Sequence, residues 1–169
     1  MKPKTYEIRA IDTDVLKQLR VQDDAGHTRE PATDPEGGAP LRCCLRRSAP
    51  GERIALVSYA PLRRWAAETG AEPGAYDEYG PVFIHAEACE GPGAGTLRYP
   101  AALHGDRRVL RAYGAEGRIL GGHLLELPRE RSAEVEQALA EVFADPLVTL
   151  VHVRAVEYGC FLLEARRLA

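Results

Sequence analysis

This sequence lacks the features that mark membrane, secreted and nucleic-acid-binding proteins. None of its apolar runs approaches the ~18 residues of a membrane-spanning helix, and residues 1–9 contain no apolar stretch of the signal-peptide type. The formal net charge is -3 and the basic doublets are few and scattered, whereas a nucleic-acid-binding protein normally presents a strongly basic face. We therefore expect a cytoplasmic protein that contacts neither membrane nor nucleic acid.

The common catalytic and phosphate-binding motifs are also missing. The chain has no Cys-x-x-Cys pair, no His-Glu-x-x-His motif, no Gly-x-Ser-x-Gly elbow and no Gly-x-x-x-x-Gly-Lys loop. The glycine-rich segment 91–95 lacks the lysine and the following helix of a phosphate loop, which favours a flexible loop. Any chemistry must therefore come from residues that the fold brings together.

The overall composition is that of one globular domain. Hydrophobic residues make up 45% and charged residues 28% of the 169 residues, enough for one buried core but few for two. We expect a single domain over residues 1–169. Asparagine is absent and lysine is scarce, which is typical of a GC-rich bacterial gene.

Apolar periodicity predicts more strands than helices. Short helices are expected after residue 12 and over 61–69, and a longer one over about 132–144. The polar or Gly- and Pro-rich segments 22–40 and 90–105 predict two long loops. Strands are expected over 5–10, 41–45, 53–59, 81–89, 107–113, 118–126, 147–156 and 160–166.

The connections between these strands indicate hairpins rather than a regular β-α-β rhythm. Turn residues predict hairpins between 41–45 and 53–59, between 107–113 and 118–126, and between the last two strands. The sequence therefore predicts an α+β fold. Its mostly antiparallel sheet is built from hairpins, with a short N-terminal helix, a short central helix and the longer helix packed on it.

Polar side chains inside apolar strands are the candidate site residues. His85 lies in the most apolar strand, where a buried imidazole needs a partner or a task. Side chains two apart along a strand share a face, which groups Arg111 with Tyr113 and His152 with Arg154. If the polar faces converge, one surface carries Arg42, His85, Arg111, Tyr113, His152 and Arg154.

Such a surface would suit an anionic ligand. Arginines bind carboxylate or phosphate through paired hydrogen bonds, and a nearby histidine could act as a general acid or base. We expect ligand binding by the three arginines and Tyr113, and proton transfer by His85 and His152. The alternative is a solvated sheet face on which the arginines pair with glutamates such as Glu87.

Metal binding is not predicted. A strand would point adjacent Cys43 and Cys44 to opposite faces, and it would separate His85 from Cys89 by about 13 Å. A metal site would need Cys43 or Cys44 to meet Cys160 and a histidine, and buried core thiols are the simpler interpretation. We expect no metal and no cofactor.

Cys160 is the best candidate for a nucleophilic thiol. It follows Gly159 and lies one turn from His152, and a reactive thiolate needs an adjacent histidine. A cysteine that opens a strand usually serves packing. A thiol or metal enzyme using Cys160 with a histidine is therefore an alternative rather than the leading hypothesis.

Five short motifs occur in an order that resembles a known family. They are residues 41–45 (LRCCL), 50–59 (PGERIALVSY), 80–85 (GPVFIH), 110–113 (LRAY) and 151–161, which begins VHVR and ends GCF. The ordered set resembles the short bacterial proteins of domain-of-unknown-function family 1203, from about Leu41 to the C-terminus. Because that family has no established activity, the resemblance indicates which family the chain is similar to and implies no function.

The leading hypothesis is a small cytosolic protein that binds a small anionic metabolite in a pocket lined by arginine and histidine. An enzyme with a histidine acid or base is an extension of this hypothesis. The main alternative is a non-catalytic interaction or structural module. Enzymatic activity and a homodimer are both left open.

Overall fold

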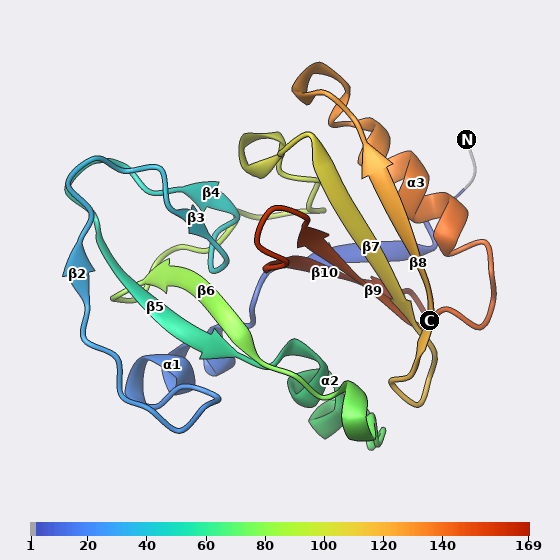
Figure 1. The fold of residues 1–169 in the computed structure, drawn as a ribbon, viewed down its shortest axis with the longest axis horizontal. Coiled ribbons are helices and arrows are strands. Elements are labelled where there is room, and N and C mark those ends of the chain that lie inside the picture. Colours follow the sequence, from blue (N-terminus) through green and yellow to red (C-terminus); the bar gives the residue numbers. More distant parts are fainter. Residues whose placement is uncertain (1–2) are drawn as a thin grey trace.

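Two five-stranded sheets and three α-helices make up residues 3–169, the part of the chain that the computed structural model describes (Figure 1). The first sheet has the strand order β1-β10-β9-β7-β8, and the second has the order β2-β5-β6-β3-β4. Every strand pair is antiparallel except β3–β6, which is parallel. The predicted α+β class with mostly antiparallel pairing is confirmed.

The first sheet is built largely from two hairpins that the sequence predicted. These are β7–β8 and β9–β10, and β1 adds an outer strand beside β10. Its strands are β1 (Tyr6–Arg9), β7 (Arg107–Tyr113), β8 (Ile119–Glu126), β9 (Leu150–Ala155) and β10 (Phe161–Arg167).

Helix α3 (Glu134–Val142) covers one face of the first sheet (Figure 1). Its Val135 and Leu139 are fully buried against alternate residues of the strands, including Leu110 and Val153. The buried residues of the helix recur every three to four positions and those of the strands every second position. Both periods are therefore visible as apolar patterns in the sequence. The helix is shorter than the predicted span of about 132–144.

The second sheet is smaller and less regular. Helix α1 (Thr13–Val21) contributes Leu16 and Leu19 to its core, and α2 (Pro61–Thr69) packs Trp65 against the first sheet. The strands are β2 (Ala32–Thr33), β3 (Pro40–Leu41), β4 (Arg46–Arg47), β5 (Arg53–Tyr59) and β6 (Gly80–His85). Short 3-10 turns lie at Gly74–Tyr76, Ala101–Leu103 and Arg129–Arg131.

The predicted hairpin between 41–45 and 53–59 was wrong. The strand there ends at Leu41, residues 42–45 form a turn, and β3 pairs with β4 and β6 instead of β5. The expected loop 22–40 also contains the short strands β2 and β3. Strands of two residues are too short for side-chain alternation to be visible in a sequence.

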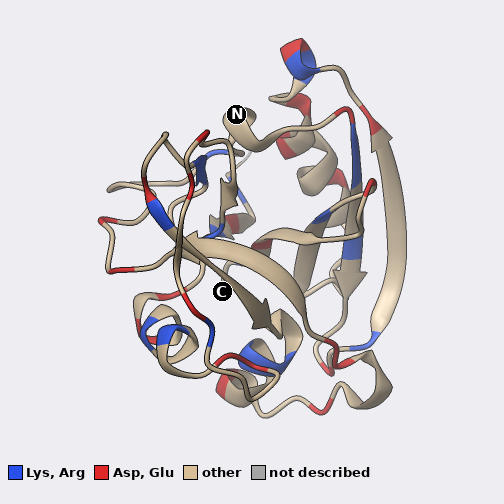
Figure 2. Cartoon of the chain, turned by 60° about the vertical axis from the view of Figure 1, so that its left-hand side comes forward, with Lys and Arg blue, Asp and Glu red and all other residues tan. Residues whose placement is uncertain are grey.

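Phe161 joins the two sheets. It opens β10 in the first sheet, yet its ring packs within the core of the second sheet and meets the ring of Tyr59 edge-on at a centroid distance of 5.4 Å. The buried Arg42 side chain donates from Nε to the Phe161 carbonyl oxygen (2.8 Å). Charged residues of both signs are interspersed over both sheets and their loops (Figure 2).

We expect Leu139→Ala to destabilise the protein by about 2–5 kcal/mol, because it removes a fully buried side chain between α3 and the first sheet. Urea unfolding measures this change. Leu147→Ala is the matched control, since Leu147 is 69% exposed and its loss should change the free energy of unfolding by less than about 0.5 kcal/mol. Equal effects of the two substitutions would contradict the packing of α3.

Candidate metal centre

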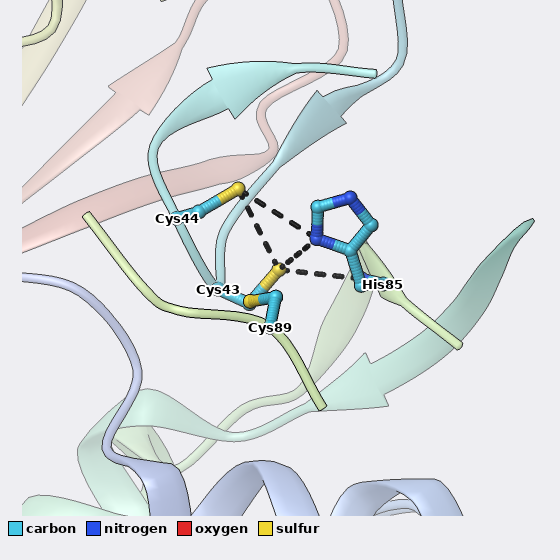
Figure 3. A group of neighbouring side chains, drawn as sticks. All are labelled: Cys43, Cys44, His85 and Cys89. Atoms are coloured by element: carbon cyan, nitrogen blue, oxygen red, sulfur yellow. Dashed lines mark hydrogen bonds between the residues drawn. The ribbon is translucent and has the colours of Figure 1, made fainter. Parts of the chain in front are cut away.

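Four potential metal ligands meet at one end of the second sheet: Cys43, Cys44, His85 and Cys89 (Figure 3). Their ligand atoms all lie within 4.8 Å of one another. The first three residues are buried and Cys89 is partly exposed. Three sulfurs with one imidazole nitrogen are a donor set typical of zinc.

A turn brings Cys43 and Cys44 together. Residues 42–45 follow β3 directly, and the Leu45 N–H closes the turn on the Leu41 carbonyl oxygen (3.0 Å). Leu45 has φ 56°, a left-handed conformation that costs a non-glycine residue roughly 1–2 kcal/mol. The two Sγ atoms are 3.9 Å apart, so the expectation that a strand would separate them was wrong.

His85 faces this turn because β6 ends there. Its backbone N–H donates to the Sγ of Cys43 (3.2 Å), beyond the point where the short strand β3 stops pairing with β6. The chain leaves the sheet after His85 and returns Cys89 to the thiols (Figure 3). The predicted strand over 81–89, with His85 and Cys89 about 13 Å apart, was therefore wrong.

The distances among the three buried donors match one tetrahedral ion. Bonds of about 2.3 Å to sulfur and about 2.0–2.1 Å to nitrogen place two sulfurs about 3.8 Å apart, and a sulfur and a nitrogen about 3.6 Å apart. The sulfur–sulfur distance in Cys43–Cys44 is 3.9 Å, and the His85 Nδ1 lies 3.4 Å and 3.8 Å from the two sulfurs. The side chains are thus already spaced as ligands of one centre.

Glu52 orients the His85 ring from the other side. Nε2 of His85 lies 3.2 Å from Oε1 of Glu52 and 3.3 Å from Nη2 of Arg46. In the tautomer that donates Nε2–H to the carboxylate, Nδ1 is free to bind a metal. Arg46 holds Glu52 through two hydrogen bonds of 2.7 and 3.0 Å, and the Ala49 N–H donates to it as well. These contacts lower the pKa of Glu52 to about 2, which keeps its carboxylate charged.

Arg20 lies where it could balance the charge that a zinc centre would carry. Zinc with three thiolates and a neutral imidazole carries one excess negative charge, and the Arg46 charge is already paired with Glu52. The Arg20 side chain of α1 donates from Nε to the His85 carbonyl oxygen (3.1 Å), and its Nη2 is buried without a hydrogen-bond partner among residues 3–169. Arg20 is half-buried, and the buried Nη2 atom lacks an acceptor that the negative charge of a zinc–thiolate centre would supply.

The Cys43 thiol donates a hydrogen bond to the Cys44 sulfur at 3.9 Å. A hydrogen bond from Cys43 to Cys44, together with burial, raises the pKa of Cys43. The same bond lowers the pKa of Cys44 despite burial, and the Arg46 backbone N–H adds to this effect. Metal binding must displace the remaining protons, so its affinity should rise with pH.

Little in the sequence predicts this cluster. The Cys43–Cys44 pair was considered for a metal site with Cys160, but the Sγ of Cys160 contacts the Tyr158 carbonyl oxygen and lies outside the cluster. Cys89 was set aside because the strand was expected to continue past His85. The informative signal was the glycine-rich segment from residue 91, since a chain that enters a loop can reverse direction.

The predicted arginine surface forms only in part. Arg111 in β7 and Arg154 in β9 lie on the same face of the first sheet, and the carboxylate of Glu78 lies between them. Glu78 forms an ion pair with Nη1 of Arg111 and lies 3.7 Å from Nη1 of Arg154. Tyr113 is buried beside Arg111, whose charge opposes the rise in the pKa of Tyr113 caused by burial.

The two candidate histidines do not meet. His152 is almost fully buried in β9, where its Nε2 lies 2.9 Å from Oε2 of Glu164 and its ring packs against Tyr113 and Phe161. His85 has separate partners at the end of the second sheet. The two histidines therefore do not act as a pair, and each must be assessed in its own environment.

Arg42 and Glu87 also have separate roles in the structure. Arg42 donates to the backbone carbonyl oxygens of Phe161 and Pro40, and among residues 3–169 it does not contact Glu78, the carboxylate that Arg111 and Arg154 share. Glu87 pairs with Arg53 at 3.0 Å instead of with His85. Arg42 thus stabilises the junction between the sheets.

Comparison with known proteins identifies one family. A family model described as a protein of unknown function, DUF1203, matches residues 38–167. No curated protein and no solved structure matches the chain. Within residues 3–169, no helix is both long enough and apolar enough to cross a membrane.

The buried pair of Glu164 and His152 should make the stability of the protein depend on pH. Burial alone would raise the pKa of Glu164, but the hydrogen bond from His152 and the charge of Arg166 lower it below its usual value of 4.5. A carboxyl group whose pKa is lower in the folded state stabilises the fold above its unfolded pKa, and this contribution is lost as the pH falls through the folded pKa. We therefore expect the free energy of unfolding to decrease below about pH 4.5.

Glu164→Gln should remove this pH dependence together with about 3–5 kcal/mol of stability at neutral pH, because it leaves a buried partner without its counter-charge. Urea unfolding between neutral and acid pH measures both effects. Glu130→Gln, at an exposed position, is the control. An unchanged acid dependence in Glu164→Gln would contradict the assignment.

Proposed function

Since the chain belongs to the DUF1203 family, whose function is unknown, we propose from its site alone that it binds one zinc ion through Cys43, Cys44, His85 and Cys89. The observation that carries the proposal is the spacing of the three buried donor atoms, which matches the edges of a tetrahedron around zinc, with the Cys89 sulfur within 4.8 Å of each of them. The Glu52 carboxylate on the far side of His85 and the charge of Arg20 support it further.

Zinc fits better than other metals. Thiolates are soft ligands that select zinc, copper(I) or iron–sulfur clusters, and they disfavour magnesium and calcium, which bind oxygen atoms. Four ligand atoms within 4.8 Å of one another converge on a single ion and leave no room for a cluster of several irons. We also propose that the protein resides in a bacterial cytoplasm, where the thiols stay reduced and available.

The ion would join three separate segments of the chain. It would connect the turn at 42–45, the end of β6 and the loop that carries Cys89, and binding to the folded form alone would add to the stability of the second sheet. We propose that this stabilising effect is the first role of the centre, because four protein ligands fill a tetrahedral site.

We expect the protein purified under reducing conditions to contain one zinc ion per chain, measured by elemental analysis. Replacement by Co²⁺ should give thiolate charge-transfer absorption and the visible bands of a tetrahedral ion. Cys44→Ser should abolish stoichiometric binding. Glu52→Gln should weaken it about 10- to 100-fold, the usual effect of removing a hydrogen-bond partner of a ligand histidine.

Cys160→Ser is the matched control, because it removes the one cysteine that lies outside the cluster. It should bind zinc with unchanged stoichiometry and affinity. If the protein takes up no zinc and no Co²⁺, or if Cys160→Ser and Cys44→Ser lose metal to the same extent, the zinc assignment is wrong.

A second candidate function follows from the arginines of the first sheet. We propose that Arg111, Arg154 and Tyr113 bind the carboxylate or phosphate group of a small molecule. The supporting observation is that both guanidinium groups share one carboxylate, that of Glu78, which comes from the loop before β6. Two guanidinium groups and one carboxylate leave one excess positive charge. The Glu78 carboxylate also shows how the carboxylate of a ligand could bind to both arginines.

The surroundings of Arg154 favour an anion. Burial lowers the pKa of Arg154, and the charge of Arg111 lowers it further, so an additional negative group would relieve both effects. A cavity of about 130 Å³ is lined by Glu78 and Arg154, enough for a phosphate or a short carboxylic acid, whereas Arg111 and Tyr113 lie outside its lining. His152 lies on the same sheet face, but its ring is 1% exposed and paired with Glu164, which argues against proton transfer to a ligand.

Inorganic phosphate and succinate are suitable probes, with binding measured by calorimetry. Glu78→Gln should strengthen binding about tenfold (~1.4 kcal/mol) because it removes the competing internal carboxylate. Arg111→Leu combined with Arg154→Leu should abolish it. Arg107→Leu, at an exposed position in the same strand, is the control and should bind like the wild-type protein. Indistinguishable titrations of all four proteins would exclude this candidate.

A further inference from the structure

Cys89 is held differently from the other three ligands of the metal centre. We propose that it is the oxidisable ligand, and that its reaction with a hydroperoxide releases the metal. This inference rests on the proposed zinc site. It assigns the centre a second role, in which the metal stays bound under reducing conditions and is released on oxidation.

Three ligands are fixed by the fold. Cys43 and Cys44 lie in a turn that two backbone hydrogen bonds hold, from Leu45 to Leu41 and from Arg42 to Phe83. His85 is the last residue of a paired strand and is held at Nε2 by Glu52. All three residues are at most 9% exposed. They have little freedom to leave a bound ion.

The segment that carries Cys89 lacks such support. Within the described chain, residues 87–99 form no backbone hydrogen bond with a neighbouring strand or helix, and only a local turn at 91–92 and the bond from the Tyr99 N–H to the Glu136 side chain (2.8 Å) hold them. Gly91, two residues after Cys89, has φ 74°, and a Cβ atom there would meet no other atom within 4 Å. Few backbone hydrogen bonds and open surroundings mark a segment that opens locally at low free-energy cost. Cys89 is therefore the ligand that can leave without unfolding the sheet.

Solvent reaches the cluster from the side of Cys89. A surface pocket of about 460 Å³ is lined by Cys89, Cys44 and His85, and it does not include Cys43. Cys89 itself is partly exposed, whereas Cys43 is 1% exposed. A small oxidant that enters the pocket meets Cys89 as the most accessible sulfur, and oxidation of cysteines follows thiolate character and exposure.

The chemistry needs a hydroperoxide, for which hydrogen peroxide is the simplest example. The Cys89 thiolate attacks one peroxide oxygen: an S–O bond forms, the O–O bond breaks, and hydroxide leaves. The Cys43 thiolate then attacks the Cys89 sulfur, forming the S–S bond while the S–O bond breaks and a second hydroxide leaves. Two thiolates are oxidised to a disulfide and one peroxide is reduced to two hydroxide ions.

Cys43 is within reach for this second step. All ligand atoms of the cluster lie within 4.8 Å, and the sulfurs of Cys43 and Cys89 are neighbours in Figure 3. Because the Cys89 segment is free to move and the Cys43 turn is not, the loop can supply the shift that a disulfide requires. The ion then keeps only Cys44 and His85 as ligands, too few to retain zinc against a chelator. A dithiol reductant should restore binding.

The test uses the full chain loaded with zinc under reducing conditions and then freed of reductant. Hydrogen peroxide is added in the presence of a chromogenic chelator that reports released zinc, and peptide mapping after differential alkylation identifies the oxidised cysteines. We expect zinc release to coincide with a disulfide between Cys43 and Cys89, and both to reverse with a dithiol.

Cys89→His is the decisive variant, because imidazole keeps a fourth ligand that peroxide does not convert into a disulfide. It should retain zinc and release it at least about tenfold more slowly than the wild-type protein. Cys89→Ser provides a second test, since it should bind zinc more weakly yet form no disulfide with Cys43. Cys160→Ser is the control and should release zinc like the wild-type protein.

Different outcomes would exclude the zinc site and the oxidisable role of Cys89. If the reduced protein holds no zinc before peroxide is added, the zinc site itself is wrong. If zinc is bound but stays bound under peroxide, if Cys89 remains a free thiol while zinc leaves, or if Cys89→His loses zinc as fast as the wild-type protein, the oxidisable role of Cys89 is overturned.

Discussion

The turn at residues 42–45 is the constraint on which the rest of the structure depends. Its first residue, Arg42, donates from a buried guanidinium to the Phe161 carbonyl oxygen and so connects the second sheet to the first. Its next two residues place their thiols at the end of β6. Burial lowers the pKa of Arg42 to about 10, a cost that is accepted because the hydrogen bonds to carbonyl oxygens satisfy the charge. One turn therefore sets both the junction of the sheets and the metal-binding geometry.

This arrangement explains why the strand β3 is so short. A longer β3 would continue its pairing with β6 and would send adjacent side chains to opposite faces. Ending it at Leu41 exposes the His85 N–H, which Cys43 then satisfies through its sulfur. The left-handed Leu45 completes the reversal at a local cost in free energy. Strained backbone conformations are common at functional sites, and Leu45 lies directly after the two thiols of the cluster.

The elements that could be predicted from the sequence are those in which local periodicity and tertiary packing agree. Helix 61–69, strand 53–59 and strand 107–113 have the predicted bounds, because each presents one apolar face to a core at its natural spacing. The metal cluster depends on where strands end, and a strand end is decided by contacts between distant segments. Nothing within 81–89 marks His85 as the last paired residue. A strand that continued regularly to residue 89 would separate Cys89 from His85 by about 13 Å, so the sequence did not predict that the two side chains meet.

The same reasoning separates the two cysteines that lie outside buried turns. Cys160 stands beside Phe161, at the start of a strand whose register fixes it, and no second sulfur or free imidazole approaches it within the described residues. Cys89 lies in a segment without backbone pairing, yet it reaches three other donors. Proximity in sequence to a histidine favoured Cys160, whereas freedom of the chain favours Cys89. A ligand from a separate segment can reach the other donors more easily when its backbone is not fixed by strand pairing, and here that segment is the loop after β6.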